Sequence, residues 1–368
     1  MSDRKLFTPY RLGNIELQNR VVMAPMTRNR ANNPDFAPND IMVEYYRQRA
    51  SAGLIITEGI PVSDQGRGYA FTSGVYSDAQ AAGWKKVTQA VHQAGGRIYA
   101  QIWHCGRINH SSLRADRSPP VGPSSITAQA KTMGLNLETG APAFLPCEPP
   151  HALTIPEIKA VVADFVLNAK NAIAAGFDGV EIHGANGYLL DEFRCPFIND
   201  RQDEYGGSLE NRCRLHLEIA QAVSDAVGAE RVAMRLSPYG AANDMKPDPD
   251  PIATYGYLAR ECEKIGLAYL HFYDQGMTWI HEAGHPLLKT LRESFSRALI
   301  LCGGFDGDKA EAALAAGSGD LIAFGKPYVS NPDLVTRLQT AVELAAWNTK
   351  TFYGGGAAGY TDYPALVA

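Results

Sequence analysis

Short runs of apolar and β-branched residues recur along the chain, and each is followed by a stretch with helical spacing. Each run is short enough to be a strand that is buried on both faces. Eight strands that alternate with helices predict a parallel sheet, and eight is the number that closes a barrel. An open, doubly wound sheet is the alternative architecture. The eight predicted strands are residues 21–25, 54–57, 97–103, 179–182, 232–236, 268–272, 298–302 and 320–324.

The clearest helix is predicted from Pro156 to Ala175. Thr154 can cap its N-terminus, and Glu157, three residues later, completes a capping box. Ahead of the first strand, residues 7–17 have the pattern of a small hairpin that could close the floor of the barrel. Both features agree with a barrel whose strands and helices alternate.

Residues 105–151 form a long interruption with no helical period, and they hold seven of the chain's 22 prolines. A loop of that length inside a compact domain usually has a function, such as a lid. It follows the third strand, so it leaves the barrel at the end where barrel enzymes place their active sites. The pattern therefore predicts one domain over residues 1–368: an α/β TIM barrel, (β/α)₈, with an N-terminal hairpin plug and a long capping loop after strand three.

Composition excludes several classes of protein. The 368 residues carry 34 Lys and Arg against 39 Asp and Glu, a net charge of −5, so nucleic-acid binding is not expected. No apolar run approaches the roughly 18 residues of a membrane span. The six cysteines include no C-x-x-C pair, which argues against iron–sulfur and zinc-ribbon sites. We therefore expect a cytoplasmic enzyme, monomeric or homodimeric, that does not bind membranes.

One zinc-binding pattern occurs in the sequence. Residues 281–285 match H-E-x-x-H, in which two histidines on one helical face bind the metal. Gly284 weakens such a helix, and Pro286 moves His285 away from helical backbone angles. A polar loop is the preferred interpretation, and a zinc hydrolase that uses His281 and His285 is the alternative.

Glycines end the last two predicted strands. Gly303 and Gly304 follow strand seven, whereas Gly325 and Lys326 follow strand eight. In barrels of this kind the loops after these two strands commonly bind phosphate. Glycine lets backbone N–H groups approach an anion closely, and the lysine adds a cation. The pair of corners predicts a cofactor that carries a phosphate.

Polar and aromatic side chains end other strands. Gln101 and Trp103 alternate on strand three, and Arg235 lies at the end of strand five. A buried arginine needs an anionic or strongly polar partner. That partner is either a cofactor or an internal carboxylate such as Glu58 or Glu181.

Strand four runs into the sequence His-Gly-Ala-Asn-Gly-Tyr at residues 183–188. His183 and Asn186 are three residues apart, and on one turn they could direct two hydrogen-bond donors at one oxygen. Preorganised donors of that kind polarise a carbonyl group. Tyr188 follows directly and adds a hydroxyl to the same rim of the barrel.

These residues resemble those of the Old Yellow Enzyme family of FMN-dependent ene-reductases, and the match runs from about Leu6 to Pro364. The segments that carry it are Ala24–Arg28, Glu44–Tyr46, Gln101–His104, His183–Tyr188, Tyr205–Arg212, Tyr353–Gly356 and Gly359–Pro364.

The resemblance implies that FMN binds without a covalent bond on the C-terminal face of the barrel. It also implies that His183 and Asn186 bind the substrate's carbonyl oxygen and that Tyr188 protonates the α-carbon. Tyr69, Trp103 and Tyr360 would shape the substrate pocket. The flavin ring would contact Pro25, Met26, Thr27, Gly59, Gln101 and Arg235, and Gly303, Gly304, Gly325 and Lys326 would hold the phosphate.

The implied reaction is reduction of an activated alkene by NADPH or NADH through the flavin. Reductive cleavage of nitrate esters or nitro compounds at the same flavin is the alternative activity. A flavin-binding protein without catalysis would have no use for the donors at His183, Asn186 and Tyr188. Lys326 stands where many members of the family carry arginine, which would replace two-point phosphate binding by a single point charge.

Overall fold

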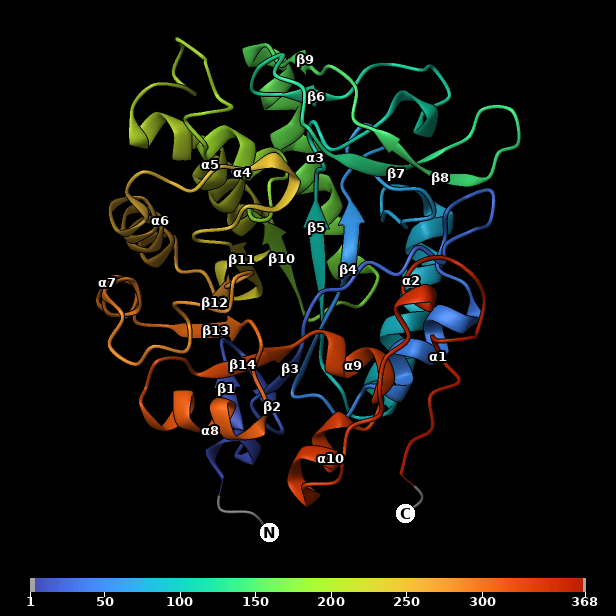
Figure 1. The fold of residues 1–368 in the computed structure, drawn as a ribbon, viewed down its shortest axis with the longest axis vertical. Helices are drawn as coiled ribbons and strands as arrows, with labels where there is room; N and C mark the ends of the chain where they lie inside the picture. The colour runs from blue at the N-terminus through green and yellow to red at the C-terminus, as the bar shows by residue number, and fades with distance from the viewer. Residues whose placement is uncertain (1–3, 367–368) are drawn as a thin grey trace.

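The eight strands close into one parallel barrel in the computed structural model, which describes residues 4–366 (Figure 1). Their order around the barrel follows their order along the chain, as right-handed β-α-β connections require. The prediction of a closed barrel is therefore confirmed, and the open-sheet alternative is wrong. The strands are β3 (Val21–Met23), β4 (Leu54–Pro61), β5 (Ile98–Trp103), β10 (Gly179–His183), β11 (Val232–Leu236), β12 (Tyr269–Tyr273), β13 (Ala298–Cys302) and β14 (Leu321–Phe324).

Helices surround the barrel and cover the outer face of its strands (Figure 1). Every barrel strand is buried along nearly its whole length, because its outer side chains pack on helices and its inner ones fill the barrel. No helix among residues 4–366 is both long and apolar enough to cross a membrane. The helices are α1 (Asp40–Gln48), α2 (Asp78–Gln93), α3 (Ile155–Ala174), α4 (Leu189–Arg194), α5 (Leu209–Val227), α6 (Pro251–Ile265), α7 (Pro286–Ser294), α8 (Gly307–Ala315), α9 (Lys326–Ser330) and α10 (Leu334–Thr340).

The predicted N-terminal hairpin is present as the antiparallel strands β1 (Tyr10–Leu12) and β2 (Ile15–Leu17). Leu12 and Leu17 are buried and pack into the cluster that fills the inside of the barrel. The hairpin therefore closes the barrel floor, as predicted. Because side chains fill the floor, the opposite, C-terminal end of the barrel is left for a ligand.

The capping box predicted for α3 is confirmed. The Thr154 hydroxyl accepts a hydrogen bond from the N–H of Glu157, and the Glu157 carboxylate accepts one from the N–H of Thr154 at 2.7 Å. The N–H and the hydroxyl of Thr154 both donate to the Glu157 carboxylate and hold its pKa down to about 2. The helix begins at Ile155, one residue earlier than predicted, because the cap fixes the start.

The long segment after β5 is more structured than the sequence predicted. It contains four short strands, β6 (Val121–Gly122), β7 (Lys131–Leu135), β8 (Pro142–Pro146) and β9 (His151–Ala152). β7 and β8 pair as an antiparallel hairpin that lies beyond the C-terminal ends of β4 and β5 (Figure 1). Prolines at both ends of β8 obscured this hairpin in the sequence. The predicted position above the catalytic end is nevertheless correct.

Candidate active site

A cavity of about 820 Å³ opens at the C-terminal end of the barrel. It brings together most of the predicted cofactor residues from strands far apart in the sequence. Tyr69 and Tyr188, predicted for the substrate pocket, line the same space. The predicted cofactor residues on its wall are Pro25, Met26, Thr27, Arg235, Gly303, Gly304, Gly325 and Lys326.

The two glycine corners form one side of the cavity. Gly304 has a φ of 62°, in the left-handed region that favours glycine, and its backbone comes close to Met277. At Gly325 a side chain would meet no atom closer than 3.9 Å, so its backbone faces open space. The ammonium of Lys326 lies over the Trp347 ring at 5.9 Å. Exposed backbone and one cation in a concave corner fit the phosphate of a flavin nucleotide.

Arg235 supplies the positive charge on the cavity wall. It is 6% exposed, and its Nε has no hydrogen-bond partner among the described residues. Its guanidinium lies 4.9 Å from the centre of the Tyr273 ring. The internal carboxylate Glu181 is engaged instead by Gln101 and His271. A buried arginine with an unused donor fits the electron-rich edge of a flavin ring, which gains negative charge on reduction.

Four aromatic side chains cluster at one wall of the cavity. The Trp103 ring lies 4.8 Å from Tyr188, 5.7 Å from Tyr69 and 5.8 Å from His183, centre to centre. Trp103 also lies against the backbone of Gly59, where a Cβ atom would come within 2.6 Å of the indole. Gly59, Trp103 and His183 thus stand directly behind the side chains that line the cavity.

His183 is held as a neutral hydrogen-bond donor. Burial, reinforced by the charge of Arg235, lowers the pKa of His183 well below its ordinary value. Its Nδ1 accepts the N–H of Ala185 at 3.3 Å, which leaves the ring proton on Nε2. The second nitrogen can therefore donate to an oxygen in the site.

Tyr188 is protonated and has a hydroxyl neighbour. Burial raises the pKa of Tyr188 above its ordinary value and that of Tyr69 well above it. The two hydroxyl oxygens are 3.1 Å apart. The ring of Tyr188 is 5.0 Å from that of His183, so a proton source on the cavity wall and a neutral donor behind it are neighbours.

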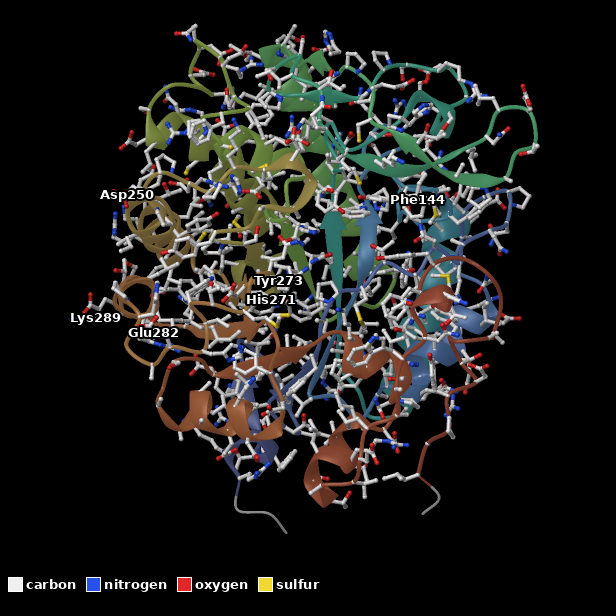
Figure 2. All side chains as sticks on the ribbon, in the orientation of Figure 1. Phe144, Asp250, His271, Tyr273, Glu282 and Lys289 are labelled. Carbon is white, nitrogen blue, oxygen red and sulfur yellow. The ribbon has the colours of Figure 1, made fainter. Side chains whose placement is uncertain are left out.

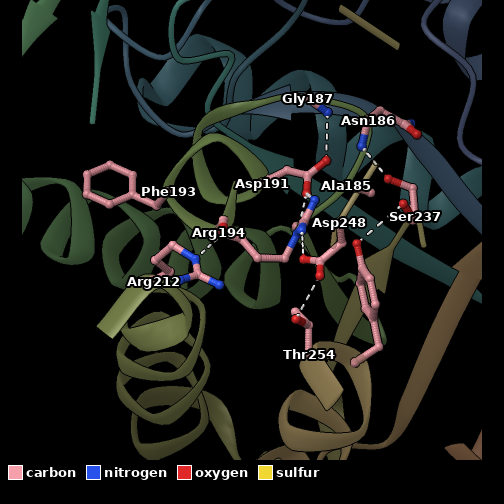
Figure 3. Close-up of polar contacts among 12 residues, drawn as sticks. Ala185, Asn186, Gly187, Asp191, Phe193, Arg194, Arg212, Ser237, Asp248 and Thr254 are labelled. Atoms are coloured by element: carbon pink, nitrogen blue, oxygen red, sulfur yellow. Dashed lines mark hydrogen bonds and ion pairs between the residues drawn. The ribbon is translucent and has the colours of Figure 1, made fainter. Parts of the chain in front are cut away.

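Asn186 lies in the left-handed region, with a φ of 59°. Its N–H donates to Ser237 Oγ at 2.8 Å, and the next N–H, of Gly187, donates to Asp191 Oδ2 at 2.9 Å (Figure 3). These bonds fix the turn between β10 and α4 that carries the three predicted catalytic residues. Asn186 is not part of the cavity lining, so its predicted contact with the substrate remains a prediction.

A buried ion network supports this turn from below (Figure 3). Arg194 lies between two carboxylates, 2.7 Å from Asp191 and 2.5 Å from Asp248. All three side chains are at most 3% exposed. Asp248 also accepts the hydroxyl of Thr254 at 3.1 Å. Sequence analysis missed this network, because Asp191 and Asp248 lie far apart in the chain.

Tyr360 lies outside the cavity, so its position does not match the prediction that it shapes the substrate pocket. Its ring is fully buried and stacks on Tyr45 at 4.0 Å. Arg28 and Arg30 lie over the same ring and donate to carbonyls of the C-terminal tail. Tyr353 lines the cavity instead. The Tyr-Gly-Gly-Gly sequence at 353–356 was the signal that could have identified it.

The β7–β8 hairpin contributes cavity residues that sequence analysis did not name. Lys131 and Met133 come from β7, and Phe144 from β8. Figure 2 shows Phe144 on this hairpin, away from the barrel interior where His271 and Tyr273 lie. The available signal in the sequence was the spacing of Lys131 and Met133, two residues apart, which places them on the same face of a strand. This signal is weak in so short a strand.

The H-E-x-x-H residues do not share a helix. α7 begins at Pro286, and His285 is its N-cap. His281 packs on Phe305 at 4.5 Å, whereas His285 packs on Trp279 at 5.9 Å. Residues 4–366 contain no group of three His, Cys, Asp or Glu side chains arranged to hold a metal ion. The preferred interpretation, a polar loop, agrees with this geometry.

Comparison with known proteins identifies the family. Residues 5–345 match the model of the NADH:flavin oxidoreductase / NADH oxidase family. The chain is 42% identical to flavin oxidoreductase hxnT of Emericella nidulans, over 98% of this chain and 97% of that protein. It is 40% identical to 12-oxophytodienoate reductase 2 of Arabidopsis thaliana, over 98% and 96%.

Solved structures agree with these sequence matches. Morphinone reductase superposes with a TM-score of 0.94 at 43% identity, over 99% of this chain and 97% of that one. An Old Yellow Enzyme homologue from Zymomonas mobilis gives 0.92 at 39% identity, over 98% and 100%. The family match and these neighbours agree with the cavity, its cation and its glycine corners. The chain therefore belongs to the NADH:flavin oxidoreductase family, within the Old Yellow Enzyme group, and is an NAD(P)H-dependent flavin oxidoreductase.

Proposed function

We propose that this enzyme reduces the activated C=C bond of α,β-unsaturated carbonyl compounds, with non-covalently bound FMN and NADPH or NADH as the hydride donor. The observation that carries the proposal is the pairing of a neutral donor, His183, with a protonated phenol, Tyr188, which lines the cavity directly in front of it. Polarising an oxygen and protonating a carbon are the two tasks that enone reduction demands of side chains.

The cofactor would lie across the cavity between Arg235 and the glycine corners. Lys326 and the backbone of Gly303, Gly304 and Gly325 would hold its phosphate, and Arg235, Thr27 and Pro25 would contact its ring. When bound, FMN supplies the hydride that the β-carbon of the alkene accepts. The family match and one relative support the nicotinamide donor: the family model describes NADH:flavin oxidoreductases, and morphinone reductase was solved with tetrahydroNAD.

The side chains divide the remaining work. Nε2–H of His183 donates to the carbonyl oxygen of the substrate, and the side chain of Asn186 would supply a second donor to it. This polarisation draws electron density away from the β-carbon. Tyr188 then gives its hydroxyl proton to the α-carbon. Tyr69, 3.1 Å away, can stabilise the resulting phenolate oxygen with a hydrogen bond.

Tyr188→Phe tests the proposal, because it removes the proton and keeps the ring. Stopped-flow reduction of the flavin by NADPH should be nearly unchanged, since that half of the cycle needs no α-carbon proton. Reoxidation by 2-cyclohexenone should slow by about 10²–10⁴-fold. Reoxidation by oxygen or by a nitrate ester serves as the control and should be spared.

Two results would contradict the proposal. Equal slowing with every acceptor would mean that Tyr188 only packs the wall of the cavity. A wild-type enzyme that reduces nitrate esters but leaves enones untouched would favour reductive cleavage as the activity. The cofactor itself is tested separately by heat release and chromatography, which should yield FMN rather than FAD.

A further inference from the structure

The inside of the barrel contains a polar cluster where barrels of this type carry aliphatic side chains. Gln101 on β5 and Glu181 on β10 are partners in the sheet register, as are Arg235 on β11 and His271 on β12. Gln101 Nε2 donates to one Glu181 oxygen at 2.8 Å, and His271 Nδ1 is 2.9 Å from the other. His271 is fully buried, and Figure 2 shows it next to Tyr273.

Glu181 carries a negative charge in this cluster. Its side chain and that of His271 are completely buried. Burial alone would raise the pKa of Glu181, but His271, Arg235 and Gln101 together lower it below its ordinary value. A buried carboxylate is weak evidence for stability, because apolar residues of similar volume commonly serve a core as well or better. The charge therefore needs a functional explanation.

The carboxylate determines how Gln101 is oriented. An ionised carboxylate only accepts hydrogen bonds, so the Gln101 NH₂ group must face it. The Gln101 carbonyl oxygen is then left to accept a hydrogen bond from another partner. Arg235, whose side chain reaches the cavity, offers only donors. The pyrimidine edge of a flavin ring has one N–H donor, at N3, beside acceptors at N1 and O2. An acceptor from Gln101 and donors from Arg235 match that edge.

We infer that Glu181, held by His271, is a positioning residue for the flavin. It keeps the Gln101 carbonyl directed at the N3–H group, and its negative charge behind Arg235 disfavours the reduced ring, which carries more negative charge. The inference rests on FMN binding as proposed above. Glu181 acts through Gln101 and Arg235, because the floor of the barrel and its own partners keep it from the substrate.

Glu181→Gln tests the inference. Titration of apoprotein with FMN should give a dissociation constant about 2- to 10-fold higher, the loss expected for one oriented hydrogen bond. The midpoint potential of bound FMN, measured against a reference dye, should become more positive because a nearby negative charge is gone. Tyr99→Phe is the matched control. Its hydroxyl is buried in the barrel without a partner among the described residues, so both values should stay unchanged.

Gln101→Met keeps the inference falsifiable if Glu181→Gln does not fold. Gln101→Met should weaken FMN binding by a similar factor. The double variant Gln101→Met, Glu181→Gln should bind FMN no more weakly than Gln101→Met, because Glu181 acts on binding through Gln101. Unchanged FMN affinity in Gln101→Met, or unchanged affinity and potential in Glu181→Gln, would overturn the inference. A wild-type protein that binds no FMN would instead refute the proposed function, so the two failures can be told apart.

Discussion

Arg194→Met should destabilise the protein strongly, because it removes the one cation between two buried carboxylates. Arg194 contacts Asp191 at 2.7 Å and Asp248 at 2.5 Å, and no member of this network is more than 3% exposed (Figure 3). Methionine fills much of the same volume, so the cost is mainly electrostatic. Removing one partner from a buried ion pair costs about 3–5 kcal/mol, and two facing carboxylates place this variant at the upper end.

The assay is urea unfolding of the FMN-loaded protein, followed by circular dichroism. The turn at 186–187 should loosen as well, since Asp191 accepts the N–H of Gly187. Phenolic ligands, which under the proposed function would bind through an oxygen at His183, should therefore bind more weakly.

Arg47→Met is the matched control. Arg47 also makes two contacts of 2.7 Å with a carboxylate, that of Glu44, but these side chains are 52% and 41% exposed. An exposed pair of this kind contributes about 0–1 kcal/mol. If both variants lost the same stability, burial of the network would not be the source of its importance.

Three further predictions concern the cavity and its surroundings. In a fluorescence titration, Lys326→Ala should raise the dissociation constant of FMN, whereas Lys326→Arg should keep or lower it. Unchanged FMN affinity in Lys326→Ala would mean that the phosphate binds elsewhere. Gly59→Ala should displace Trp103, because the added Cβ would come within 2.6 Å of the indole, and should therefore slow enone reduction in steady-state assays. In Gly356→Ala the added Cβ would have no atom within 4 Å, so this variant should behave as wild type. Burial raises the pKa of Glu58 to about 7, whereas in the unfolded chain it is about 4.3. The protonated Glu58 side chain therefore contributes its full share to the free energy of unfolding below about pH 4.3, and this share is lost as the pH rises through 7. Glu58→Gln should therefore gain stability relative to wild type between pH 5 and pH 8, and parallel urea curves at both values would contradict that pKa.

Features that depend on neighbouring residues could be read from the sequence. The eight strands, the floor hairpin and the capping box of Thr154 and Glu157 each follow from patterns a few residues long, and the structure confirms them. The glycine corners could be located as well, because a barrel always brings the ends of its last two strands to the same face. Local pattern and fold class together were enough to predict that these corners line one cavity.

Contacts between distant residues were decided only by the tertiary structure. Tyr353, not Tyr360, reaches the cavity, because two buried arginines hold the C-terminal tail with Tyr360 turned against Tyr45. The neutral state of His183 depends on burial and on Arg235, from a neighbouring strand. Nothing within a few residues of either side chain encodes these outcomes.

The polar groups inside the barrel illustrate the same division. The sequence by itself determined that Gln101, Glu181 and Arg235 lie on strands, since each sits in a short apolar run. Only closure of the barrel decided that Glu181 meets Gln101 and His271 rather than Arg235 or solvent. The physical reason is that a strand's alternation is set by its own residues, whereas the partner of a buried charge is set by sheet register and by which side chains the barrel encloses.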